Sequence, residues 1–326
     1  MRYCLCLSYE GADFCGWQIQ PSSPSVQACL EGALSRLLNR PVSVTGAGRT
    51  DTAVNAVNYV AHFDLEGALP FEASDFIYKL NAILPRSVAV LSVTPVADDF
   101  HARFSARRRE YTYFLHRQKD PFLRGYSWQC GYPVLDFDAM NEACRFLLGT
   151  HDFSCFEKTG TDNKTSICTV YDAFWKPYVP SHVAVMGTSE EGHAPSGACP
   201  PPDEYRGRGP LDTSPEGTLE TMGGAGVQRS GTESPEGACP SSLCDRGWPQ
   251  VCETIPSPVA GNYWYFRIAA DRFLRNMVRA TVGSLIEIGR GKHSPEWIAD
   301  LISHGTRSDA GESVPGHALF LNSVEY

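Results

Sequence analysis

The stretch from Gly46 to Asp51 reads GAGRTD and places a guanidinium and a carboxylate between two segments with strand-like patterning. Alternate residues of an extended segment project to the same side, so we expect Arg49 and Asp51 to face each other. A neighbouring guanidinium favours the ionised carboxylate, which suits a nucleophile better than a general acid. The spacing therefore predicts either a structural salt bridge or a catalytic carboxylate at Asp51, and spacing alone favours the salt bridge.

A phosphate-binding loop explains the two glycines less well. The stretch lacks the closing Lys-Ser or Lys-Thr pair of one such loop and the third glycine of the other. A nucleotide-loop interpretation of this stretch is therefore weak.

A basic segment between residues 101 and 109 is the second candidate for chemistry. Its histidine and four arginines are His101, Arg103, Arg107, Arg108 and Arg109. Arginine suits bidentate phosphate contacts, and the interleaved aromatic residues could stack on bases. A charge run is more often a solvated face, but a second basic stripe at Arg272, Arg275 and Arg279, spaced for one helical face, favours nucleic acid.

Tyr111 follows the arginine run at the start of a strand. Base rates favour an ordinary strand aromatic, whereas proximity to Asp51 would allow its ring to stack on a flipped-out base. His62 and His151 are lone histidines beside aromatic residues, and we interpret both as structural.

Composition sets the class of protein. The 326 residues are 42% hydrophobic, which predicts a sizeable core and two domains. No segment reaches the roughly 18 apolar residues of a membrane span, and the N-terminus favours a strand over a signal peptide. The 12 cysteines are dispersed rather than paired as zinc ligands, so we expect a reduced, cytoplasmic, metal-free protein.

Residues 187–258 differ from the rest of the chain. They hold 11 acids and 4 bases, so much of the net charge of −9 lies in this segment. Glycine and proline make up about a third of it, beyond the usual threshold for low complexity. We therefore predict a disordered insertion that joins two hairpin strands.

The elements outside this insertion predict an α+β fold. Residues 3–96 read as strand, helix, strand, strand, helix, strand, which is the split βαβ or ferredoxin-like order. The second half predicts strands at 111–115, 168–175, 179–186, 263–268 and 319–324, and helices at 137–148, 273–288 and 295–303. We expect two α/β domains, 1–104 and 105–326, the second interrupted by the insertion.

Four groups of residues resemble one family when taken together. They are Gly48-Arg49-Thr50-Asp51; Tyr9-Glu10-Gly11 with Phe14-Cys15-Gly16-Trp17-Gln18; Asp99-Phe100-His101-Ala102-Arg103-Phe104; and Met277-Val278-Arg279 with Val282-Gly283. The matches cover residues 3–186 and 261–326, which is nearly everything outside the insertion. In this combination the chain resembles the tRNA pseudouridine synthase A family.

The resemblance implies two α/β domains that share one continuous, mostly antiparallel sheet with a central cleft. It implies a homodimer that binds the tRNA anticodon stem-loop and isomerises uridine to pseudouridine at positions 38, 39 and 40, without cofactor or metal. Asp51 falls on the catalytic aspartate, Tyr111 on a substrate-contacting tyrosine, and Arg49 and Arg279 on active-site arginines. The segment from Arg103 to Arg109 falls on RNA-contacting surface.

The sequence departs from the family pattern just after the aspartate. Ala53 stands where the family usually has glycine, and Asn55 stands in place of a histidine. Ala53 is costly if the backbone there needs a positive φ, and Asn55 lacks the imidazole that could contact RNA at this position. Two other functions therefore stay open: a catalytically weakened RNA-binding or RNA-folding module, and a carboxylate-dependent hydrolase, which would need a second catalytic acid.

Overall fold

The computed structural model describes residues 1–158, 160, 165–186 and 261–326. The chain divides into two compact units, Met1–Pro180 with Cys252–Tyr326, and Ser181–Val251. The described part of the second unit is the helix α4 (Ser181–Met186), where the sequence predicted a strand. Pro180 cannot donate to a strand ladder, and the short stretch after it forms a helical turn instead. The predicted insertion at 187–258 lies outside the described residues.

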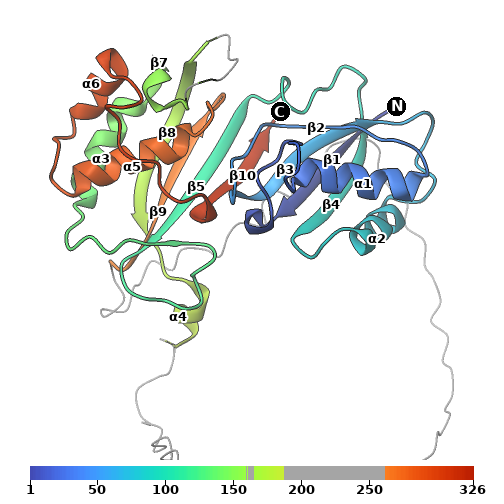
Figure 1. The fold of residues 1–326 in the computed structure, drawn as a ribbon, viewed down its shortest axis with the longest axis horizontal. Helices are drawn as coiled ribbons and strands as arrows, with labels where there is room; N and C mark the ends of the chain where they lie inside the picture. The colour runs from blue at the N-terminus through green and yellow to red at the C-terminus, as the bar shows by residue number, and fades with distance from the viewer. Residues whose placement is uncertain (159, 161–164, 187–260) are drawn as a thin grey trace, which may run out of the picture. The chain divides into compact units, whose positions relative to one another are not determined.

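The first unit is built on one sheet of ten strands in the described chain (Figure 1). Along the sheet the order is β4 (Val88–Val96), β1 (Arg2–Tyr9), β3 (Asn55–Asp64), β10 (Leu319–Glu325), β5 (Arg108–His116), β9 (Tyr263–Ala270), β8 (Ile167–Pro177) and β7 (Gly149–Asp152). Off this path, β2 (Val44–Gly46) pairs with β3, and β6 (Trp128–Gln129) pairs with β5. The β3–β10 and β5–β6 pairs are parallel, and the other pairs are antiparallel. The fold is therefore a mixed α/β fold on a mostly antiparallel sheet.

The first half of the sequence forms the elements in the predicted order. They are β1 (Arg2–Tyr9), α1 (Val26–Leu38), β2 (Val44–Gly46), β3 (Asn55–Asp64), α2 (Ala73–Ile83) and β4 (Val88–Val96). The Ser25 hydroxyl accepts a hydrogen bond from the Ala28 amide at 3.3 Å and thereby caps the N-terminus of α1. Asn39 ends this helix in the left-handed conformation.

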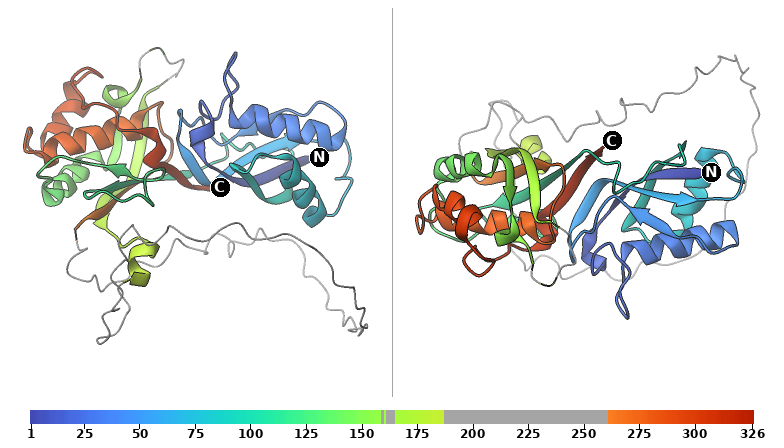
Figure 2. Two further views of the ribbon diagram at one scale, coloured as in Figure 1. Left: turned by 60° about the horizontal axis from the view of Figure 1, so that its bottom comes forward. Right: turned by 90° about the horizontal axis from the view of Figure 1, so that it is seen from above.

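The second half forms a comparable set of elements. They are β5 (Arg108–His116), β6 (Trp128–Gln129), α3 (Phe137–Cys144), β7 (Gly149–Asp152), β8 (Ile167–Pro177), β9 (Tyr263–Ala270), α5 (Met277–Gly289), α6 (Trp297–His304) and β10 (Leu319–Glu325). The predicted helix at 137–148 stops earlier and continues as a 3-10 turn, Arg145–Leu147. The α1–α2 pair and the α3, α5 and α6 group lie at opposite ends of this unit in all three views (Figures 1 and 2).

Buried apolar side chains form two large clusters, one in each half of the first unit. Tyr111 packs against both clusters. In β10, Leu319 belongs to the cluster in the second half of the chain and Leu321 to the cluster in the first half, so this strand joins the two cores. Within the described residues, no helix combines the length and apolar character needed to span a membrane.

Candidate active site

Asp51 lies on the loop between β2 and β3, and buried aromatic side chains support this loop. The Tyr59 hydroxyl donates a hydrogen bond to the Gly48 carbonyl, and Trp17 stacks on Tyr59 with ring centroids 4.1 Å apart. The Tyr9 and Thr50 hydroxyls are 2.9 Å apart in the protein interior. Both residues that flank Arg49 are therefore anchored, and a rigid scaffold presents the exposed Arg49 and the half-buried Asp51.

Close backbone contacts fix the same loop from two sides. A Cβ atom at Gly16 would lie 2.4 Å from the Thr50 carbonyl oxygen, and one at Gly316 would lie 2.4 Å from that of Thr52. Both positions therefore require glycine. Ala53 has φ = 63°, so the backbone at this position does adopt the positive φ at which alanine is costly.

Asp51 is paired with cations from the start of α5. Its Oδ2 lies 3.7 Å from a terminal nitrogen of Arg279, and its Oδ1 lies 4.0 Å from Nε of Arg275. Within the described residues, neither carboxylate oxygen accepts a hydrogen bond, and 23% of the side chain is exposed. The carboxylate therefore has cationic neighbours without being tied to a donor, which leaves its oxygens free to approach a substrate.

Arg49 does not form the predicted salt bridge. No ion pair joins Arg49 to Asp51 in the described chain, where the cations paired with Asp51 are Arg275 and Arg279. The structural salt bridge favoured by spacing is therefore a wrong prediction. Arg49 instead has an exposed side chain on the wall of the pocket that contains Asp51.

That pocket has a volume of about 420 Å³ and is lined by basic residues around one acid. Its charged lining residues are Arg49, Asp51, Lys158, Arg275 and Arg279. The Lys158 amide donates to the Arg275 carbonyl at 3.0 Å, which brings the two chain segments together. Four cations and one carboxylate in the lining make the pocket strongly attractive to a phosphate-bearing ligand. No spacing pattern in the chain predicts that Lys158 lies here.

The approach to α5 explains how Arg275 and Arg279 reach Asp51. Asn276 adopts a left-handed conformation with φ = 66° and donates from Nδ2 to the Ser313 hydroxyl at 2.7 Å. The helix therefore begins at Met277 rather than at the predicted Phe273. Arg272 and Arg275 precede the helix, so the predicted helical stripe of three arginines is wrong. Nε of Arg279 donates to the Val314 carbonyl at 2.7 Å, which holds the guanidinium with one terminal nitrogen 3.7 Å from Asp51.

Tyr111 lies on β5 between Leu321 of β10 and Ile268 of β9. Its ring packs edge-on against Phe273, with centroids 5.0 Å apart. Burial raises the pKa of the Tyr111 phenol, Arg109 opposes that shift, and the carboxylate of Asp51 adds to it. Tyr111 is therefore within electrostatic reach of Asp51. A role for its ring at the same site depends on such proximity.

Four members of the basic segment lie at or near the surface. Arg103 and Arg107 are exposed, while His101 and Arg108 are partly exposed. Arg103 packs over the Phe104 ring at 5.6 Å, and Phe104 is 75% exposed. Arg108 is already paired with Glu325 at 3.4 Å, so its charge is partly neutralised within the protein.

Arg109, the fifth residue predicted to contact RNA, lies in the interior. It is 9% exposed, and its guanidinium donates to the carbonyls of Ala47, Arg103 and Asp271. Its geometry corrects the sequence-based expectation, since a run of arginines is ordinarily a surface feature. Asn55 is also buried: its side chain accepts from the Gly11 amide at 2.8 Å and donates to the His317 carbonyl at 2.7 Å.

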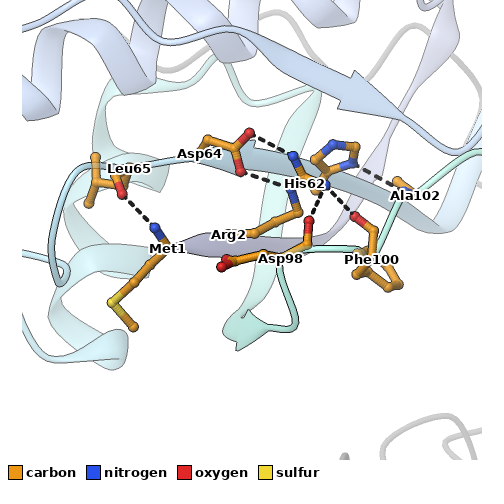
Figure 3. A network of polar contacts seen from close by, with 8 residues as sticks. All are labelled: Met1, Arg2, His62, Asp64, Leu65, Asp98, Phe100 and Ala102. Atoms are coloured by element: carbon orange, nitrogen blue, oxygen red, sulfur yellow. Dashed lines mark hydrogen bonds and ion pairs between the residues drawn. The ribbon is translucent and has the colours of Figure 1, made fainter.

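His62 belongs to a network that holds the basic segment against the sheet (Figure 3). Its Nδ1 accepts a hydrogen bond from the Ala102 amide at 3.1 Å. Nearby, Arg2 pairs with Asp64 at 2.8 Å and donates to the Phe100 carbonyl, also at 2.8 Å. Burial, with the Arg2 cation, lowers the pKa of His62 to about 4. The neutral imidazole has a structural role, as its sequence context indicated.

No group of three or more His, Cys, Asp or Glu side chains in the described residues has the arrangement of a metal site. The candidate site thus consists of Asp51 and the basic residues that line its pocket, with Tyr111 on β5 within electrostatic reach of Asp51.

Comparison with known proteins places this chain in a family. A family model described as tRNA pseudouridine synthase matches residues 143–326. Proteins named tRNA pseudouridine synthase A from Bacteroides thetaiotaomicron and Bacteroides fragilis are 38% and 37% identical over 325 residues. These alignments cover 100% of this chain and 90% and 96% of the two relatives. A protein of the same name from Porphyromonas gingivalis is 36% identical, with 100% of this chain and 97% of the relative aligned. The chain therefore belongs to the tRNA pseudouridine synthase family, whose members are isomerases.

Proposed function

We propose that this enzyme isomerises uridine to pseudouridine at positions 38, 39 and 40 of the tRNA anticodon stem and loop, with Asp51 as the nucleophile. The observation that carries the proposal is the pocket around Asp51, in which one partly exposed carboxylate is paired with Arg275 and Arg279 and shares the lining with Arg49 and Lys158. The names of the relatives supply tRNA as the class of substrate.

The chemistry accounts for these residue types. Pseudouridine formation breaks the glycosidic bond at N1, rotates the uracil, joins C5 to the sugar, and moves a proton from C5 to solvent while N1 regains one. An ionised carboxylate can attack the sugar or the base, or assist removal of the C5 proton. The reaction is a redox-neutral rearrangement within one nucleotide, so we propose that it needs neither cofactor nor metal.

The target base has to leave the helical stack before Asp51 can reach it, which costs a few kcal/mol. We propose that Arg49 and Arg279 bind the extruded nucleotide and that the Tyr111 ring contacts its base. Contacts from cations to the flanking phosphates offset the cost of extrusion. We assign those outer contacts to His101, Arg103, Arg107 and Arg108, the four members of the basic segment that retain surface exposure.

We propose two ferredoxin-like domains, 1–104 and 105–326, that share the sheet around a central cleft. The first half has the strand order β4-β1-β3-β2, and β10-β5-β9-β8 repeats that order in the second half. With β6 and β7 left aside, this repeated order supports the proposal, because it is the order expected of two split βαβ units. We further propose that the protein is cytoplasmic and forms a homodimer. Sedimentation of the purified protein tests the dimer directly.

A hydrolase is the less favoured function at this pocket. Glycoside hydrolysis ordinarily uses two carboxyl groups, and Asp51 is the single acid among the pocket-lining residues. A catalytically weakened RNA-binding module would retain the cations but form no product. Ala53, which holds a left-handed backbone without glycine, is the observation that favours this second candidate.

The proposal is tested by incubating the enzyme with unmodified tRNA transcripts and mapping pseudouridine at each uridine. We expect product at positions 38, 39 and 40 with the wild-type enzyme, and none with Asp51→Ala. Binding of both proteins to the same tRNA provides the control for folding. Binding without product from the wild type would favour the weakened module, and equal product from both proteins would exclude Asp51 as the nucleophile.

A further inference from the structure

Arg109 is a buried cation whose partners are main-chain carbonyls. Nε and one terminal nitrogen donate to the Ala47 carbonyl at 3.3 and 3.0 Å. The same terminal nitrogen donates to the Arg103 carbonyl at 2.6 Å, and the other donates to that of Asp271 at 2.6 Å. These contacts occupy four of the five N–H groups of a guanidinium. In the described residues no carboxylate pairs with Arg109.

The three acceptors belong to three separate segments of the site. Ala47 is on the loop that continues to Asp51, and Arg103 is on the basic segment. Asp271 follows β9 and leads into the turn that carries Arg275 and then α5. One side chain thus connects the carboxylate loop, the proposed RNA-contacting segment and the strand that delivers the paired arginines.

The relative placement of these segments determines the ion pairs at Asp51. The distances to Arg279 and Arg275 are 3.7 and 4.0 Å, and each joins the Ala47 loop to the Asp271 segment. A shift of either segment by 1 Å would change these contacts and displace the carboxylate from the bound nucleotide. Misplacement of that size costs about 100-fold in rate when it affects reacting groups.

We propose that Arg109 is a positioning residue for pseudouridine formation, holding the Asp51 loop in register with the Arg275 and Arg279 segment. The inference rests on the proposed function and deepens it, because it assigns a role in the chemical step to a residue that does not contact RNA. Its burial and its occupied N–H groups separate it from Arg107, a neighbouring arginine with an exposed side chain.

Lysine is the informative replacement at this position. It keeps the positive charge and most of the stem, but a single ammonium cannot reach carbonyls on three segments in the geometry of a planar guanidinium. Arg109→Lys therefore removes the hydrogen bonds that join the three segments while it keeps the positive charge. A matched control is Arg117→Lys: Arg117 also donates from its guanidinium to main-chain carbonyls, those of Tyr132 and Pro133, outside the residues that line the pocket.

The experiment measures three quantities on unmodified tRNA: the single-turnover rate at saturating enzyme, the dissociation constant, and the melting temperature of each protein. For Arg109→Lys we expect a rate lowered about 10- to 100-fold with a dissociation constant within about threefold of wild type. For Arg117→Lys we expect a lower melting temperature and a rate within about threefold of wild type. A role limited to global stability would not move the saturating rate of folded protein.

Several results would overturn the proposal. Weaker tRNA binding with an unchanged saturating rate would make Arg109 an RNA contact, and a normal rate with normal binding would make it a bystander. If Arg109→Lys is unfolded at the assay temperature, Arg109→Gln is assayed below its own melting midpoint, with the same expected outcome. A wild-type enzyme that forms no pseudouridine would refute the proposed function itself, whereas an active wild type matched by Arg109→Lys refutes only the role of Arg109.

Discussion

Ala53 holds a backbone conformation that suits glycine, directly after the proposed nucleophile. At φ = 63° its Cβ crowds the neighbouring carbonyl, a cost of about 1–2 kcal/mol for a residue other than glycine. The position tolerates alanine because contacts at Thr50, Thr52 and Val54 fix the loop on both sides. Strain of this kind tends to persist where the surrounding structure overdetermines a functional loop.

Replacing this residue by glycine should stabilise the protein. We expect Ala53→Gly to raise the free energy of unfolding by about 0.5–1 kcal/mol, since relief of strain exceeds the added entropy of the unfolded chain. Ala28→Gly in the exposed face of α1 is the control and should lower it by about 1 kcal/mol. Urea unfolding measures both variants, and destabilisation by Ala53→Gly would contradict the claim that the backbone at Ala53 is strained.

Lys158 tests the charge of the pocket. Because it lines the Asp51 pocket without an ion-pair partner in the described residues, we expect Lys158→Gln to weaken tRNA binding. The slope of log K against log salt should fall by about 1, as for loss of one phosphate contact. Lys79→Gln on α2, outside the lining residues, is the control. An unchanged salt slope in Lys158→Gln would exclude a phosphate contact.

The pKa of His62 determines how the free energy of unfolding should respond to acid. Its pKa is about 4 in the folded protein and near 6.5 when unfolded, so the unfolded chain binds the proton first. Stability that is fully present above pH 6.5 is therefore lost as the pH falls toward 4, by up to about 3 kcal/mol. His62→Asn retains an acceptor for the Ala102 amide and should flatten this dependence. Identical pH profiles in denaturant unfolding would refute the assignment.

At the scale of elements, the turn before α5 decides whether Arg275 and Arg279 meet Asp51. We expect Asn276→Ala to lower the free energy of unfolding by about 1–2 kcal/mol, because alanine both resists a positive φ and loses the bond to Ser313. Asn276→Gly keeps the backbone conformation and should cost less. Denaturant unfolding of the two variants checks this order, and equal losses would show that the backbone conformation is unimportant.

Most elements could be predicted from the sequence because their signals are local. Ser25 marks the start of α1, and alternating residues mark β1 and β4. The start of α5 was misjudged because Phe273 to Asn276 fits a helical pattern, while a tertiary bond to Ser313 holds Asn276 left-handed. The strand predicted at 179–186 is instead helical from Ser181 to Met186, because Pro180 cannot donate to a strand ladder.

The candidate site could be predicted from the sequence only where its signals are local. Asp51 and Arg49 stand out through spacing and glycine content, whereas the approach of Lys158 and Arg275 depends on long-range packing. The inward direction of Arg109 is likewise invisible in a run of arginines, because only the fold shows which member faces the core.

At the scale of the whole molecule, both the sheet and the Asp51 pocket come from residues outside the low-complexity insertion. We therefore expect deletion of residues 192–249 to leave the rate of pseudouridine formation within about twofold of wild type. Removal of its excess negative charge should, if anything, strengthen binding of the polyanionic tRNA at low salt. A collapse in tRNA affinity after the deletion would show that the insertion is part of the RNA-binding surface.

The central claim, that the Asp51 carboxylate performs the chemical step, is tested most directly by Asp51→Asn. Asparagine keeps the shape of the side chain and removes its charge, so tRNA binding should persist within about threefold while the single-turnover rate falls by more than about 1,000-fold. Product is measured at saturating enzyme with a tRNA that carries one target uridine. A rate within tenfold of wild type, with binding intact, would contradict the account.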